Sequence, residues 1–198
     1  MGVPTIDTGP MTVEEFYAFT DTRPDEEKWE LIDGEPILNA APSPTHQLII
    51  RNVVFALTTW ERQLNAPWMV LPELGVRVSN TNRPEPDVLV ISSSVRSLDP
   101  QQRDVSNVMV AFEVLSPSTK ARDLRWKRTA YTSLASLTHY IVIAQDAVEV
   151  VVFARDDDFA ERRIRSMDET IELRSLGISL PVAEIYRDTE LGSDRVGA

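Results

Sequence analysis

Two short runs of β-branched and apolar residues constrain the fold most. They are Val88–Ile91 and Val108–Phe112, and Pro, Ser or Asn residues lie close to the ends of each run. Runs of this length with such boundaries are typical of strands that are buried on both faces. The sequence therefore predicts an α/β fold in which helices flank a mixed central sheet.

One carboxylate adjoins each run. Asp87 enters the first predicted strand, and Glu113 lies near the exit of the second. Neighbouring strands lie about 4.8 Å apart, so these carboxylates would converge on one divalent cation if the two strands pair. Hard cations such as Mg²⁺ or Mn²⁺ prefer oxygen ligands of this kind. The ordinary alternative is a turn aspartate and a solvated glutamate.

Residues 119–131 predict a helix directly after the second strand. Ser116 or Ser118 can cap it, and Leu124, Lys127 and Tyr131 recur at helical spacing. The helix would carry Lys127 back over the end of the strand. Two acids and a lysine beside a metal ion suit phosphodiester hydrolysis, because the ammonium group can orient water or offset developing charge.

The charge of the chain is uneven. Its formal net charge is −11, from 20 basic and 31 acidic residues, and this opposes binding to a polyanion. The predicted helix is nevertheless basic, and its candidate nucleic-acid contacts, besides Lys127, are Lys120, Arg122, Arg125 and Arg128. The alternative is that these side chains form a solvated helix face.

Length and composition favour one domain. The 198 residues are 42% hydrophobic and include no cysteine, which excludes disulfides and thiolate metal sites and fits a cytoplasmic protein. We expect a single domain over residues 11–187, with flexible segments at 1–10 and 188–198. No signal peptide and no membrane span are predicted.

Further elements follow from local signals. A capping box at Thr12 and Glu15 predicts a helix start, and Asp33-Gly34 predicts a hairpin turn between residues 28–32 and 36–39. A long helix is expected over 45–62 and a bent strand over 68–78. The remaining expectations are strands at 139–144 and 148–154, a last hairpin between 162–166 and 170–173, and a helical turn at 182–186.

Two further residues are candidates for supporting roles. Glu30 lies in the predicted hairpin and is either a supporting carboxylate, a third metal ligand, or an acid that keeps an outer strand soluble. His46 lies in the first turn of the long helix, where it either contacts substrate phosphate or forms a local hydrogen bond. The chain has no Gly-x-Ser-x-Gly elbow and no phosphate-binding glycine loop.

Several motifs together resemble a known family. Pro86-Asp87, Glu113–Thr119, Arg122-Asp123, Lys127 and Tyr131 are similar to the Uma family of putative restriction endonucleases, a branch of the PD-(D/E)xK nuclease superfamily. The likeness spans residues 11–186 and includes the segments 30–35, 43–46 and 180–185.

This resemblance implies a restriction-endonuclease-like fold and Mg²⁺-dependent cleavage of DNA. It also implies that Asp87 and Glu113 are metal ligands and that Lys127 is the catalytic lysine. In the wider superfamily the lysine stands two residues after the acid, where this chain has Leu115. Here the lysine must come from the following helix. His139 and Ala144 also depart from the family pattern.

Two hypotheses of function follow. The first is a metal-dependent DNA endonuclease, for which a homodimer would supply one site for each strand. The second is a catalytically silent module of the same fold that binds a protein partner or a second copy of itself. The low pI of about 4.7 and the displaced lysine motivate the second hypothesis.

Overall fold

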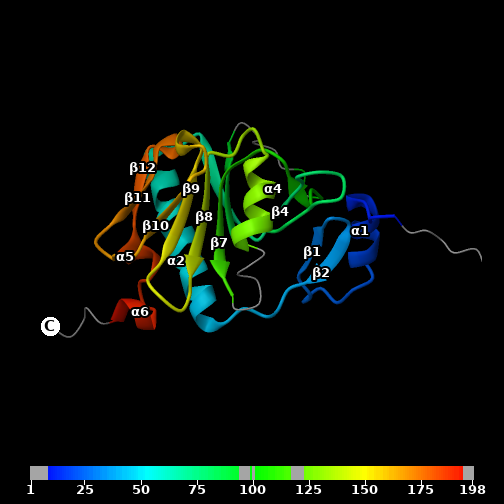
Figure 1. The fold of residues 1–198 in the computed structure, drawn as a ribbon, viewed down its shortest axis with the longest axis horizontal. Coiled ribbons are helices and arrows are strands. Elements are labelled where there is room, and N and C mark those ends of the chain that lie inside the picture. Colours follow the sequence, from blue (N-terminus) through cyan, green and yellow to red (C-terminus); the bar gives the residue numbers. More distant parts are fainter. Residues whose placement is uncertain (1–8, 94–98, 100, 117–122, 194–198) are drawn as a thin grey trace, which may run out of the picture.

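A six-stranded mixed sheet forms the centre of the computed structural model, which describes residues 9–93, 99, 101–116 and 123–193 (Figure 1). The strand order is β10-β9-β8-β7-β5-β3. Only β7 and β8 are parallel, and the other four pairs are antiparallel. The strands are β3 (Trp68–Pro72), β5 (Val88–Ser92), β7 (Val108–Leu115), β8 (His139–Ala144), β9 (Val150–Ala154) and β10 (Glu161–Ile164).

This architecture confirms the predicted α/β class and the mixed central sheet. The crossover between the parallel strands β7 and β8 contains the π-helix η1 (Asp123–Lys127) and helix α4 (Arg128–Thr132). A parallel pair needs such a crossover because a tight turn can join only antiparallel strands. Of the predicted helix over 119–131, residues 119–122 lie outside the described part of the chain.

Alternating side chains of the sheet form two cores. Helix α2 (Pro44–Leu64) covers one face and packs with Phe112 and Ile141. The other face carries Leu89 and Tyr140, which form a core with Tyr131 of α4. Successive residues of a strand point to opposite faces, so each central strand contributes to both cores. Figure 1 shows α2 and α4 on opposite faces of the sheet.

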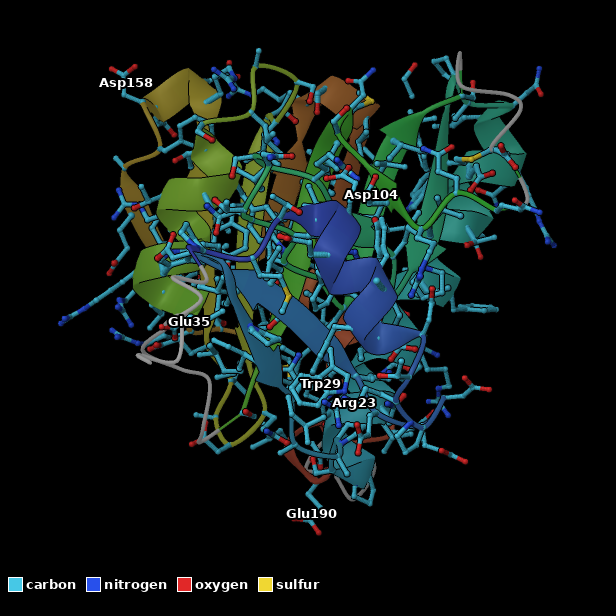
Figure 2. The ribbon with its side chains drawn as sticks, turned by 90° about the vertical axis from the view of Figure 1, so that its right-hand side faces the viewer. Arg23, Trp29, Glu35, Asp104, Asp158 and Glu190 are labelled. Carbon is cyan, nitrogen blue, oxygen red and sulfur yellow. The ribbon has the colours of Figure 1, made fainter. Side chains whose placement is uncertain are left out.

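The N-terminal elements lie beside the α4 face of the sheet. The capping box is present at the start of α1 (Val13–Thr20), and the predicted hairpin forms from β1 (Trp29–Ile32) and β2 (Glu35–Leu38). Figure 2 shows this hairpin with Trp29 and Glu35 at its opposite ends. A backbone bridge joins Leu31 to Arg83, shortly before β5. The hairpin is thereby fixed near the entry of a central strand.

The remaining strands form two small sheets. β4 (Gly75–Val76) pairs with β6 (Asp104–Val105), and β11 (Thr170–Leu173) pairs with β12 (Ile178–Pro181). The predicted bent strand over 68–78 is thus divided between β3 and β4. The predicted hairpin between 162–166 and 170–173 is wrong, because β10 adds to the edge of the central sheet and β11 turns back on β12.

Short helical turns complete the C-terminal part. These are η2 (Arg155–Asp157), η3 (Arg174–Leu176), α5 (Val182–Ile185) and α6 (Glu190–Ser193). Two terminal segments are predicted to be flexible, and the structure describes only residues 9–10 and 188–193 of them. Thr189 in the second segment is buried. Residues 1–8 and 194–198 lie outside the described part of the chain. Among the described helices, none is both long and apolar enough to cross a membrane.

Candidate active site

The register of β5 and β7 brings Asp87 close to Glu113. Val88 pairs with Phe112 in the antiparallel ladder, so Asp87, one residue before Val88, reaches the level of Glu113, one residue after Phe112. Oδ2 of Asp87 accepts a hydrogen bond of 2.6 Å from the backbone N–H of Val114. The predicted pairing of the two strands is therefore confirmed, and it places Asp87 and Glu113 at the same level of the sheet.

Glu113 lies inside the sheet rather than at a solvated strand end. Its alternation with Ala111 and Leu115 places it on the face that α4 covers, and the residue is 3% exposed. One oxygen, Oε1, accepts from Nζ of Lys127 at 2.7 Å and from the hydroxyl of Tyr131 at 3.0 Å. A buried carboxylate requires such donors, because burial without hydrogen bonds is costly.

Lys127 connects two acids from different elements. It ends η1, is 3% exposed, and places Nζ 2.8 Å from Oε1 of Glu30 and 2.7 Å from Oε1 of Glu113. The lysine thus arrives from the helix that follows the strand, whereas Leu115 occupies the position two residues after the acid. Single turns of π-helix occur frequently at functional sites.

Glu30 is the third acid of this cluster. It lies on β1 with no exposed surface, and its Oε1 also accepts a hydrogen bond of 2.7 Å from the backbone N–H of Glu85. The backbone bridge between Leu31 and Arg83 holds β1 at this place. Burial excludes the interpretation that Glu30 only keeps an outer strand soluble.

Tyr131 is a site residue to which sequence reasoning assigned no role. It is fully buried, and its ring centroid lies 5.2 Å from that of Tyr140. Burial, together with the nearby charge of Glu113, raises the pKa of Tyr131 well above its usual value, so the hydroxyl stays protonated and donates. The sequence feature that could have identified Tyr131 is its spacing of four residues from Lys127, because this spacing places both side chains on one helix face.

His46 approaches the site from the opposite direction. Ser43 caps α2 by accepting from the backbone N–H of His46, and Nε2 of His46 lies 3.5 Å from Oδ2 of Asp87. The residue is 9% exposed, and its Nδ1 makes no hydrogen bond within the described residues. The structure therefore brings His46 to Asp87.

The predicted nucleic-acid contacts have different environments. Lys120 and Arg122 lie outside the described residues. Arg125 is exposed, whereas the guanidinium of Arg128 donates to the carbonyl of Phe159 at 2.8 Å and lies 4.5 Å from the ring centroid of Phe153. Arg125 is thus accessible to a ligand, and Arg128 already packs within the fold.

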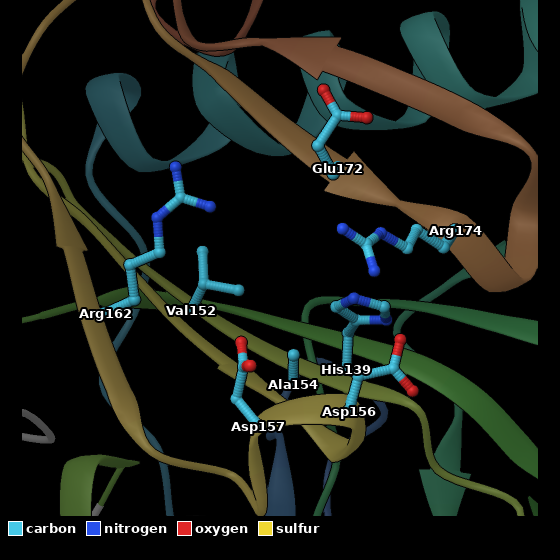
Figure 3. A pocket seen from close by; sticks show the side chains of 8 residues that line it. All are labelled: His139, Val152, Ala154, Asp156, Asp157, Arg162, Glu172 and Arg174. Atoms are coloured by element: carbon cyan, nitrogen blue, oxygen red, sulfur yellow. The ribbon is translucent and has the colours of Figure 1, made fainter.

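A second polar pocket lies on the other face of the sheet. It has a volume of about 110 Å³ and is lined by His139, Asp156, Asp157, Arg162, Glu172 and Arg174 around Val152 and Ala154 (Figure 3). His139 and Ile141 are two residues apart on β8, so their side chains point to the same face of the sheet, and Ile141 faces α2. This pocket is therefore on the opposite face from Glu113. Burial lowers the pKa of His139.

The donor set of the Asp87 site fits a hard divalent cation. Both predicted ligands offer carboxylate oxygens, and Asp87 retains 18% side-chain exposure through which a ligand can approach. Within the described ranges there is no group of three or more His, Cys, Asp or Glu residues arranged to hold a metal ion. Mg²⁺ is often bound in proteins through one or two carboxylates, with water or phosphate as its other ligands.

Comparisons with known proteins identify a family and a fold. The family model Uma2, described as "Putative restriction endonuclease", matches residues 13–183. The crystal structure of a putative nuclease belonging to DUF820 from Anabaena variabilis superposes with a TM-score of 0.72 and 16% identity. The superposition covers 89% of this chain and 98% of that one, so the two proteins share a fold.

A curated relative matches at the sequence level. The uncharacterized protein slr1290 of Synechocystis sp. is 31% identical over 121 residues, which are 58% of this chain and 60% of the relative. The match therefore spans less than two thirds of that protein.

Proposed function

The chain belongs to the Uma2 family of putative restriction endonucleases, and from this we propose that it hydrolyses phosphodiester bonds of DNA with a divalent cation held by Asp87 and Glu113. Mg²⁺ is the proposed metal, and Mn²⁺ is expected to replace it in vitro. Lys127 assists the reaction, and Glu30 and His46 support the site from two sides.

One observation carries this proposal: the buried ion cluster of Glu30, Lys127 and Glu113 beside Asp87. Removing three ionisable groups from water costs several kcal/mol for each ion, and well-packed apolar residues often serve stability as well or better. A cluster of this kind next to a partly open carboxylate is therefore a candidate functional site.

The charges of the cluster suit phosphoryl chemistry. A cation bound there would polarise the phosphodiester and lower the pKa of a bound water. Lys127 would offset negative charge that develops on the phosphate, because its ammonium group is already directed to the metal-ligand Glu113. Glu30 holds Lys127 from the other side, so the ammonium group would stay beside the site when a bound cation displaces it from Glu113.

Cleavage of duplex DNA tests the proposal. Wild-type protein is incubated with plasmid and linear DNA in Mg²⁺, in Mn²⁺ and in chelator, alongside Asp87→Ala and Lys127→Ala. The control is Asp146→Ala, because Asp146 is exposed in the turn after β8. Cleavage is expected only with metal, and only for wild type and the control. Equal cleavage by Asp87→Ala and Lys127→Ala would refute the assignment.

The second hypothesis is a catalytically silent module that binds a protein partner or its own copy. The net charge of −11 favours it, because it opposes approach to DNA. Calorimetric titration with Mn²⁺ separates the two functions. No heat of binding would favour the silent module, and size-exclusion chromatography with light scattering would then show whether a homodimer forms.

A further inference from the structure

Tyr131 and Lys127 donate to the same oxygen of Glu113. The hydroxyl of Tyr131 lies 3.0 Å from Oε1, and Nζ of Lys127 lies 2.7 Å from it. Tyr131 has no exposed surface and Glu113 is 3% exposed, so water does not compete for this contact. Two donors at one oxygen restrict rotation of the carboxylate about its last side-chain bond.

The two donors differ in charge, and this decides what each does when a cation binds. An ammonium group and a divalent cation on one carboxylate repel each other, and Lys127 is also the group that would turn toward a bound phosphate. The hydroxyl of Tyr131 carries no net charge, so a nearby cation does not expel it. Tyr131 is therefore the donor that stays on Glu113 throughout.

We propose that Tyr131 is a positioning residue that holds the carboxylate of Glu113 in the orientation required for the metal ion. The inference rests on the proposed function, since it assigns a partner to a proposed ligand. Residues that donate to a metal-ligating carboxylate typically change metal affinity or activity by about 10–100-fold when they are removed.

The ring of Tyr131 is held independently of its hydroxyl. It packs against Tyr140, with 5.2 Å between ring centroids and a tilt of 49° between the ring planes. Tyr131→Phe keeps this packing and removes only the donor. The contribution of the hydrogen bond can therefore be measured separately from that of the aromatic ring.

Tyr186 provides the matched control. It too is fully buried, but its hydroxyl lies 3.0 Å from the carbonyl oxygen of Ala144 and 2.9 Å from that of Glu149, and it accepts from the backbone N–H of Glu149 at 3.2 Å. Tyr186→Phe thus removes a buried hydroxyl that does not contact Glu113. Tyr186→Phe is expected to lose at least as much stability as Tyr131→Phe, because its hydroxyl has more hydrogen-bond partners, yet only Tyr131→Phe is expected to lose metal affinity.

The experiment is calorimetric titration of the 198-residue chain with Mn²⁺, with the Tm of each variant measured in parallel. We expect Tyr131→Phe to weaken Mn²⁺ binding by about 10–100-fold and Tyr186→Phe to leave it unchanged. DNA cleavage by Tyr131→Phe at saturating Mn²⁺ should recover more fully than at low Mn²⁺. Unchanged Mn²⁺ affinity in Tyr131→Phe would overturn the inference.

A second pair of variants protects the test against misfolding. 4-Aminophenylalanine at position 131 keeps a donor in place, and 4-methylphenylalanine fills the same space without one. The first should retain Mn²⁺ affinity and the second should lose it; equal affinities would refute the positioning role. A wild-type protein that binds no Mn²⁺ would instead refute the proposed function, so the two failures are distinguishable.

Discussion

Nζ of Lys127 lies 2.8 Å from Oε1 of Glu30, and this ion pair joins the helix after β7 to the first strand of the chain. Both residues are at most 3% exposed. The lysine that the family resemblance singles out is therefore bound from two sides, by Glu30 and by the proposed metal ligand Glu113. The proposed catalytic lysine is therefore also part of a buried ion cluster that contributes to folding.

Replacing Lys127 should affect stability more strongly than replacing an exposed lysine. Lys127→Met removes the ammonium group that lies between two buried carboxylates, and we expect a loss of about 3–5 kcal/mol in the free energy of unfolding. Lys28 is the control, because its ion pair with Glu73 is exposed and Lys28→Met should cost at most about 1 kcal/mol. Urea denaturation at pH 7 measures both, and equal losses would contradict the buried cluster.

Gly34 should be essential for the position of the hairpin that carries Glu30. Its φ is 78°, and a Cβ atom there would overlap Pro10. Gly177 has a similar φ of 71° with open space around it, so Gly177→Ala isolates the backbone strain of about 1–2 kcal/mol. Gly34→Ala should destabilise the protein by more than this amount in thermal unfolding. Equal shifts in Tm would show that the contact with Pro10 is unimportant.

Arg125 and Arg128 should have different effects on DNA binding. Arg125 is exposed, so Arg125→Ala should weaken binding across DNA sequences and reduce the slope of log K against log salt by about 1. Arg128 is bound to the carbonyl of Phe159, so Arg128→Ala should mainly lower Tm. Binding titrations at several salt concentrations measure the effect on DNA binding, and thermal unfolding measures the effect on Tm. Ca²⁺ replaces Mg²⁺ in the titrations so that the DNA is not cleaved. An unchanged salt slope for Arg125→Ala would exclude a phosphate contact.

Stability should rise with pH near the ordinary pKa of histidine because of His139. Burial lowers the pKa of His139 in the folded chain, so the unfolded chain binds the proton at a higher pH. As the pH falls below about 6.5, protonation of the unfolded state therefore reduces the free energy of unfolding. This decrease continues until the pH reaches the lower folded-state pKa. In His139→Gln the free energy of unfolding should depend less on pH in this range. Parallel curves for the wild type and the variant would contradict a lowered pKa for His139.

The sequence predicts the parts of the site that depend on local patterns. The β-branched runs identify β5 and β7, and their length and boundaries indicate burial. The placement of Asp87 and Glu113 at the same level of the sheet follows once the strands pair. The Asp33-Gly34 turn is equally local, because it requires positive φ at both residues. Such signals are contained within a few residues.

Other features depend on contacts between distant segments. Alternation in β1 places Glu30 and Leu31 on opposite faces of the hairpin, but it does not show that both faces are covered. Glu30 is buried because η1 and the segment before β5 pack against it. The wrong hairpin has a similar origin. The residues of β10 and β11 suit a hairpin locally, but the free edge of β9 takes β10 instead.

Anomalous diffraction from crystals grown with Mn²⁺ tests the central claim most directly. We predict one strong peak within coordination distance of both Asp87 and Glu113. Lys127 should then no longer contact Glu113, and its remaining carboxylate partner should be Glu30. The Tyr131 hydroxyl should still contact Glu113. A map without a peak at these carboxylates, from protein that cleaves DNA in the same Mn²⁺ solution, would show that the metal site lies elsewhere.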